Sequence, residues 1–450
     1  MLAISAGAAG LGAMFVLGAW LVDPLAPLGA LALAGLAFAT LREPAVGVAA
    51  GFLLVPLSNL GLTGRPPWLL TTAWGAFLAG IAVWRFTAPT TAVAERRIPP
   101  LALAVGLNLL VGFTSLALSG LDPEGFPELR SMATGILYFT AIALLIRTPR
   151  QFEWCLGGIA ACLTLVGGLA AWERLRGATP GEAFFTPDGA LIGRVAAGFG
   201  HPNELGGFLV ILLPFAVGGL LLSRRLRPFF AVAIVLAAFG IYGSFSRGAL
   251  VAMITIPFAF LRGRKLLVIA PLLALLLTLA TPQLVRERFA TLTESGSEIA
   301  TRVEFWSTGL TIWSEHPVLG VGLGGFPNAY AEARVPGRGF LPGTVSKPPP
   351  HAHNLFVQEL ATEGLIGLLA LLSVLGTAAV LAVRLRRRAG PVAAAIGSAS
   401  LASLVAFLVH NQFDVTLLEG TGIYFWAVLG LLAAASFSAS DGEGGTPDER

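Results

Sequence analysis

Apolar runs, most of them about 15 to 22 residues long, recur along the whole chain and are separated by short polar or charged segments. A helix needs about 20 apolar residues to cross the hydrocarbon core of a bilayer, so each run predicts a membrane-spanning helix. Because the runs at 44–58 and 247–261 are short, the pattern predicts an all-α, polytopic integral membrane protein with about 12–14 transmembrane helices. The expected spans are 3–21, 25–41, 44–58, 68–86, 99–118, 129–147, 152–173, 203–222, 228–245, 247–261, 265–282, 354–383, 391–411 and 421–438.

The composition leads to the same class of protein. Of the 450 residues, 55% are hydrophobic and only 12% are charged, against about 25% charged in a typical soluble protein. So few charges cannot solvate two or three soluble domains, which excludes a soluble enzyme, a transcription factor and a disordered protein. The net charge is +4. Basic residues of membrane proteins gather in cytoplasmic loops, so this charge gives no reason to expect a nucleic-acid partner.

The basic residues form five clusters that predict the orientation. Neighbouring clusters are separated by an even number of expected spans, so all five fall on one side, which the positive-inside rule makes the cytoplasm. Both termini are then cytoplasmic, and the first apolar run is expected to be a retained helix rather than a cleaved signal peptide. The clusters are Arg85/Arg96/Arg97, Arg147/Arg150, Arg224/Arg225/Arg227, Arg262/Arg264/Lys265 and Arg384/Arg386/Arg387/Arg388.

The spans and loops divide the chain into five expected regions. Transmembrane helices fill 1–150 and 151–282, and the second of these regions carries a smaller outer loop at 174–202. A large outer loop with short helices follows at 283–352, then the C-terminal transmembrane helices at 353–438 and a disordered cytoplasmic tail at 439–450.

One amphipathic helix is expected in the large outer loop. Ile299, Val303, Trp306, Leu310 and Trp313 recur at spacings of four and three, which is the helical period. The pattern stops at His316-Pro317 and runs into a glycine-rich segment.

Several common catalytic motifs are absent from the sequence. It contains no P-loop, no GxGxxG, no HExxH, no Asp-x-Asp pair, and no pair of Cys or His at metal-ligand spacing. We therefore expect no metal and no cofactor, and any anion would have to be bound by basic side chains.

His353 and Asn354 stand where a rigid Pro segment ends and a long predicted span begins. The positive end of a helix dipole favours a neutral imidazole, which at the membrane surface can take a proton from an alcohol. The alternative is that one of the two residues simply caps the helix.

Two arginines are candidate anion ligands. Arg247 lies in an outer turn, where the positive-inside bias disfavours arginine, so it either binds phosphate or meets lipid headgroups. Arg302 borders the apolar stripe of the amphipathic helix, where it faces either an anionic partner or Glu298, four residues earlier.

Two further polar segments are weighed more toward structure than chemistry. In 193–207, Pro202 preceded by glycines predicts a shaped loop that leads into a span, where His201 is a candidate cap and Arg194 a surface residue. The segment 410–414, His-Asn-Gln-Phe-Asp, lies at an outer helix end and is similarly ambiguous.

Five motifs in this order resemble the O-antigen ligase superfamily of bacterial envelope membrane proteins. The resemblance covers the last third to half of the chain, and the first 150 residues match only in hydropathy. The motifs are GFGHPNELGGFL at 198–209, SRGAL at 246–250, Arg302 with Trp306, HPVLGVGLGGF at 316–326 and HNLFVQELATEGLIGLL at 353–369.

The resemblance implies a glycosyltransferase of the bacterial inner membrane whose active site faces the periplasm. A ligase would move a glycan from undecaprenyl diphosphate to a sugar hydroxyl of the lipid A core, without metal or nucleotide sugar. Position by position, the resemblance implies that Arg247 and Arg302 bind the diphosphate and that His353 is the base. Asn354, Arg194 and His201 are kept as supporting candidates, and Arg194 has no firm family counterpart.

Two other functions remain as alternatives. A polymerase of the same superfamily would join lipid-linked repeats, but the single dominant outer loop favours the ligase. A solute transporter would place ionisable residues at mid-bilayer in broken helices, whereas the notable charges here are expected at the outer edge.

Overall fold

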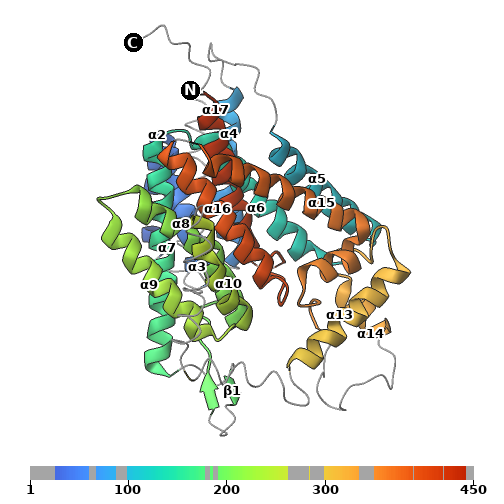
Figure 1. Ribbon diagram of the computed structural model, residues 1–450. Helices are drawn as coiled ribbons and strands as arrows, with labels where there is room; N and C mark the ends of the chain where they lie inside the picture. Colours follow the sequence, from blue (N-terminus) through green and yellow to red (C-terminus); the bar gives the residue numbers. More distant parts are fainter. Residues whose placement is uncertain are drawn as a thin grey trace.

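The computed structural model describes residues 26–59, 67–87, 99–177, 183–185, 191–261, 283, 298–333, 349–388, 390–418 and 420–441. Over these residues it is a bundle of helices (Figure 1), seven of which are long and apolar enough to cross a membrane. The predicted all-α, polytopic membrane fold is therefore confirmed. The expected spans 3–21 and 265–282, the tail residues 442–450 and parts of the large outer loop lie outside the described residues.

Proline begins many of the helices, because the first helical position has no hydrogen bond for its missing N–H to lose. Two short strands, β1 (Ala183–Phe185) and β2 (Leu191–Gly193), pair antiparallel inside the predicted loop 174–202. The helices are α2 (Ala26–Arg42), α3 (Pro44–Asn59), α4 (Pro67–Thr87), α5 (Pro100–Leu118), α6 (Gly125–Leu145), α7 (Pro149–Arg176), α8 (Pro202–Leu222), α9 (Arg227–Ser244), α10 (Arg247–Phe260), α13 (Glu298–Glu315), α14 (Phe326–Ala333), α15 (Leu355–Arg386), α16 (Pro391–His410) and α17 (Gly422–Asp441).

Helix α8 is the most buried of the spans, with 78% of its most apolar window inside the bundle. It packs against α7, α9, α10, α16 and α17. At its N-terminal end the contact is too close for side chains: a Cβ on Gly206 would lie 2.6 Å from the Ala249 side chain, and one on Gly207 would lie 2.4 Å from Thr416. Small residues of this kind let helix backbones approach in a membrane, and here the first turns of α8 and α10 and the end of α16 lie close together.

Helix α15 was expected as one uninterrupted span, but it is broken at Gly364. The backbone there has φ 65° and ψ −160°, a region that is essentially restricted to glycine. The longer limb runs from Leu365 to Arg386, and the shorter limb, 355–363, carries the residues that follow the HN motif. The break therefore decides where His353 lies relative to the bundle.

The glycine-rich loop 317–322 satisfies the backbone groups that the break sets free. The N–H groups of Val321 and Gly322 donate to the carbonyls of Ala361 and Thr362 at 2.9 and 2.8 Å. In the other direction, the N–H groups of residues 365 and 366 donate to the carbonyls of residues 317 and 318 at 3.0 and 3.2 Å. The motif HPVLGVGLGGF is thus a backbone clamp on α15.

Helix α13 forms as predicted and ends just before His316, but its buried face differs from the expected apolar stripe. Phe305 and Ile312 are buried, whereas Val303 and Leu310 of the stripe are 50% and 44% exposed. Apolar spacing alone predicts an amphipathic helix but does not distinguish a face that packs on protein from one that meets lipid. Arg302 precedes Phe305 by three residues, so it lies beside the face that packs on the bundle.

Candidate functional site

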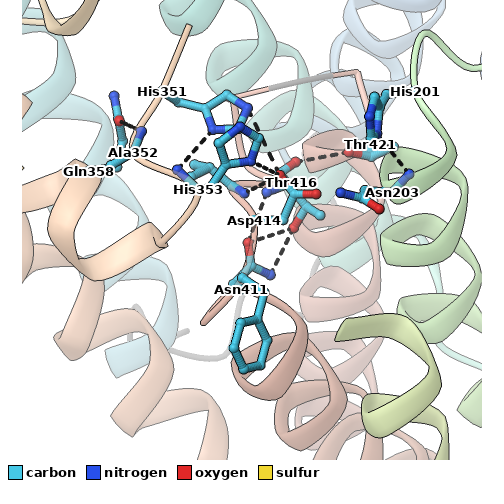
Figure 2. Close-up of polar contacts among 12 residues, drawn as sticks. His201, Asn203, His351, Ala352, His353, Gln358, Asn411, Asp414, Thr416 and Thr421 are labelled. Carbon is cyan, nitrogen blue, oxygen red and sulfur yellow. Dashed lines mark hydrogen bonds and ion pairs between the residues drawn. The ribbon is translucent and has the colours of Figure 1, made fainter. Parts of the chain in front are cut away.

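The turn that follows α16, residues 411–416, is called the central turn here, and Figure 2 shows His351 and His353 beside its Asp414. The side chain of Asn411 fixes its shape. Its Oδ1 accepts from the backbone N–H of Thr416 at 2.8 Å, and its Nδ2 donates to the Thr416 hydroxyl at 2.9 Å. Both residues are buried. A turn braced in this way is a rigid support for groups that reach it from other helices.

The start of α15 is hydrogen-bonded to the central turn. Leu355 N donates to the carbonyl of Asn411 at 2.9 Å, and Asn354 Nδ2 donates to the carbonyl of Gln412 at 3.2 Å. Asn354 is also the helix cap, because its Oδ1 accepts from the N–H groups of residues 356 and 357. The capping alternative therefore holds for Asn354, and His353 is the residue left for chemistry.

His353 and His351 both face one carboxylate, that of Asp414 in the central turn (Figure 2). His353 Nδ1 lies 3.5 Å from Asp414 Oδ1, and His351 Nε2 lies 3.9 Å from the same oxygen. The side chain of His353 is 24% exposed, whereas those of His351 and Asp414 are 8% and 7% exposed. His353 is thus the member of the group that a substrate can reach.

Burial lowers the pKa of His353 below its usual 6.5, and the attraction of Asp414 offsets only part of this effect. Burial lowers the pKa of His351 in the same way. Burial alone would raise the pKa of Asp414, but the imidazole of His353, 3.5 Å away, and the other nearby imidazoles hold it well below its usual range. At neutral pH the group therefore consists of an ionised carboxylate and a neutral imidazole that can accept a proton.

Arg302 reaches the central turn from α13. Its Nη1 donates to the carbonyl of Phe413, the residue before Asp414. One turn further along α13, the ring of Phe305 stacks on the ring of His353, with centroids 5.7 Å apart and an interplanar angle of 20°. The structure thus brings Arg302 and His353 together, although 50 residues separate them in the sequence.

Arg247 is the first residue of α10, and Ser246 caps the helix by accepting from Ala249 N at 3.4 Å. The next residue, Gly248, packs against both the end of α16 and the central turn. A Cβ at this position would lie 3.1 Å from His410 Nδ1 and 3.6 Å from the Cβ of Phe413. Arg247 is therefore next in sequence to a residue that packs on the central turn, which Arg302 contacts from α13.

Arg194 and His201 belong to the neighbouring loop and serve its structure. Arg194 was expected at the surface but is buried, with its Nε donating to the Ser244 carbonyl at 2.8 Å and its Nη2 to Asn203 Oδ1 at 2.7 Å. His201 caps α8, because its Nδ1 accepts from Asn203 N at 3.0 Å. Arg194 thereby ties the start of α8 to the residues just before the SRG motif, consistent with a supporting role.

Among the described residues, His351, His353 and Asp414 are the one group of histidine and acidic side chains compact enough to hold a metal ion, with their ligand atoms within 4.8 Å of one another. A metal-bound imidazole normally donates its second ring N–H to an acceptor. The opposite holds for His351, whose Nδ1 accepts from the His353 backbone N–H at 3.2 Å. The proton of a neutral His351 then lies on Nε2, toward Asp414, so we assign the group as two imidazoles around one carboxylate rather than as a metal site.

The residues that sequence reasoning missed are His351 and Asp414. His351 stands two residues before His353, and Asp414 stands in the ambiguous segment 410–414. The available signal was a carboxylate in a short turn between two expected spans, where it must find a partner or remain in water.

A family model described as O-antigen ligase matches residues 232–372. No curated protein matches the chain. The matched region runs from α9 into the longer limb of α15 and includes Arg247, Arg302 and His353. This match supports a membrane glycosyltransferase of the ligase or polymerase type. Residues 232–372 of the chain are thus similar to the O-antigen ligase family, which is the resemblance that the five sequence motifs indicated.

Proposed function

We propose that this protein is an O-antigen ligase, which transfers a glycan from undecaprenyl diphosphate to a sugar hydroxyl of the lipid A core. One observation carries the proposal: His353, Asp414 and Arg302 converge on one turn, and two of them lie within the region that matches the O-antigen ligase family. An imidazole for the acceptor alcohol and a guanidinium for the departing diphosphate are the two groups that such a transfer needs.

In the proposed reaction, the acceptor hydroxyl oxygen attacks the anomeric carbon of the first donor sugar. A glycosidic bond forms, the bond from the anomeric carbon to the phosphate oxygen breaks, and its electron pair leaves with undecaprenyl diphosphate. The hydroxyl proton moves to Nε2 of His353, because Nδ1 is directed at Asp414. By analogy with inverting glycosidases, this single displacement inverts the anomeric centre.

Arg302 and Arg247 would hold the diphosphate. Negative charge develops on the leaving phosphate, and cationic donors placed in advance in a partly dry site stabilise that charge much better than water does. The bond from Arg302 to the Phe413 carbonyl places the guanidinium next to the carboxylate and the imidazole. Groups at the central turn would thus act both on the attacking acceptor hydroxyl and on the leaving phosphate.

We further propose that the site faces the periplasm. Three helices run from the candidate site to segments that carry basic clusters: α10 from Arg247 to Phe260, α15 from Leu355 to Arg386, and α16 from His410 back to Pro391. The far ends are joined, since Arg386 donates to the carbonyl of Leu261. If basic ends mark the cytoplasm, the central turn lies on the opposite side of the membrane.

A reconstituted assay tests this function. The purified protein in liposomes is given a lipid-linked glycan and, in separate reactions, lipid A core or a second lipid-linked repeat as acceptor. The proposal expects glycosylated lipid A core from the wild-type protein and none from His353→Ala. Products from the second acceptor alone would make the protein a polymerase, and no product from either acceptor would refute the assignment.

A further inference from the structure

His351, the second imidazole beside Asp414, also contributes to the geometry of this site. We propose that His351 is a positioning residue for His353, which holds the backbone of His353 through one ring nitrogen and shares the Asp414 carboxylate through the other. This inference rests on the proposed role of His353 as the base. It concerns the geometry that makes His353 effective rather than the identity of the substrates.

The first contact fixes the backbone. His353 adopts φ 50°, a left-handed conformation that is uncommon for a residue with a side chain and has to be held by its surroundings. His351 Nδ1 accepts the backbone N–H of His353 at 3.2 Å, and the two rings meet edge to face with centroids 4.2 Å apart. Because the His351 side chain is 8% exposed, the ring is itself held by packing.

The second contact adjusts the carboxylate. With Nδ1 used as an acceptor, a neutral His351 carries its proton on Nε2, which faces the same Asp414 oxygen as His353 Nδ1. This oxygen accepts the Val415 N–H at 2.9 Å, and the two imidazoles compete for its remaining negative charge. The charged and titratable groups around this oxygen also include Arg302 from α13 and His410 from α16. Loss of His351 should therefore raise the pKa of His353 and keep the base protonated to higher pH.

Two variants separate the two contacts. In His351→Asn, the side-chain oxygen can still accept the backbone N–H of His353, as in an Asx turn, but the side chain is too short to reach Asp414. His351→Gln keeps an amide donor that can reach Asp414 but lacks the acceptor near its own backbone. His353 can be followed without substrate, by measuring its modification by diethyl pyrocarbonate against pH with mass spectrometry, because this reagent attacks only the neutral imidazole.

We expect His351→Asn to move the midpoint of His353 modification, and the acid limb of kcat/KM, to higher pH by roughly 0.5–1 unit. His351→Gln should leave the midpoint in place and lower kcat/KM about 10- to 100-fold at every pH, because the base is misplaced. An unchanged midpoint in His351→Asn, together with wild-type activity in both variants, would overturn the proposal. If the wild-type protein transfers no glycan while the midpoint still moves, the proposed function fails and the positioning contact stands.

Discussion

At the scale of single residues, Asp414 controls the charge of the proposed site. Its buried carboxylate accepts from Val415 N at 2.9 Å and faces two imidazoles. A buried charge persists only when such partners compensate its desolvation. If His353 takes a proton during transfer, Asp414 becomes the group that stabilises the resulting imidazolium.

The substitution Asp414→Asn should therefore lower kcat far more than it raises KM. The amide keeps the shape but lacks the charge, so we expect kcat to fall about 10²- to 10⁴-fold. Kinetics with a saturating lipid-linked donor and a varied acceptor concentration gives kcat and KM separately. Thermal unfolding in detergent shows whether the variant is folded. Asn411→Ser, which disturbs the same turn without removing a charge, is the control. Wild-type kcat in a folded Asp414→Asn protein would contradict this account.

Arg302 should not be replaceable by lysine. Guanidinium can bind phosphate in a fork while it donates to the Phe413 carbonyl, and an ammonium group cannot do both. We expect Arg302→Lys to lower kcat/KM on the order of 10²-fold, with little further loss in Arg302→Ala. Arg225→Lys, in the exposed turn between α8 and α9, should be neutral. Full activity of Arg302→Lys would show that charge alone suffices.

Transfer should also proceed in excess EDTA. Two arginines supply the positive charge for the diphosphate. Because His351 Nδ1 accepts a hydrogen bond, a neutral His351 carries its proton on Nε2, and that nitrogen then acts as a donor and not as a metal ligand. The test compares initial rates with and without chelator after the membranes have been washed with EDTA. A rate that falls with EDTA and returns with a divalent ion would replace the arginine clamp with metal catalysis.

The sequence predicted His353, Arg302 and Arg247 as candidates because each is an unusual residue at an expected membrane edge. It did not identify Asp414 or His351, because their role comes from distance in space. Asp414 reaches the histidines only because α15 is broken and its short limb is bonded to the central turn. No local pattern in 410–414 specifies that contact.

At the scale of elements, the break in α15 is the feature that builds the site. An isolated glycine in an apolar run is tolerated in a helix, so Gly364 gave no reason to divide the expected span 354–383. The glycine-rich loop 317–322 makes the break possible because its backbone forms hydrogen bonds with the N–H and carbonyl groups that the break leaves without helical partners. In transporters, broken helices leave such groups to coordinate ions, whereas here protein backbone occupies them.

The substitution Gly364→Ala should destabilise the protein and misplace His353. A Cβ there would lie 2.4 Å from the carbonyl carbon of Val318, and the backbone conformation suits only glycine. We expect a loss on the order of 2–4 kcal/mol, seen as a lower Tm in detergent, with reduced transfer. Gly376→Ala on the same helix has nothing within 4 Å of its Cβ and should leave Tm and activity unchanged. Equal Tm values for the two variants would mean that the break is not required.

At the scale of the whole molecule, the positions of charge predict which side of the membrane holds the site. Two hydrogen bonds join helix ends that are far apart in the sequence and carry basic residues: Arg85 donates to the Leu41 carbonyl at 3.0 Å, and the Arg147 carbonyl accepts from Ser438 at 2.9 Å. These contacts support one common cytoplasmic end for those helices. Hydropathy and charge predicted this arrangement from sequence, because they act on every span and do not depend on individual contacts.

Cysteine labelling in intact cells tests the orientation. The native Cys155 and Cys162 are buried and should not react. Leu191→Cys, in the exposed strand near Arg194, should react with a membrane-impermeant maleimide, whereas Arg225→Cys, in the turn between α8 and α9, should react only after lysis. The reverse pattern would place His353 in the cytoplasm. A periplasmic lipid-linked donor could not then reach it, and the ligase mechanism would fail even if the geometry of the central turn were correct.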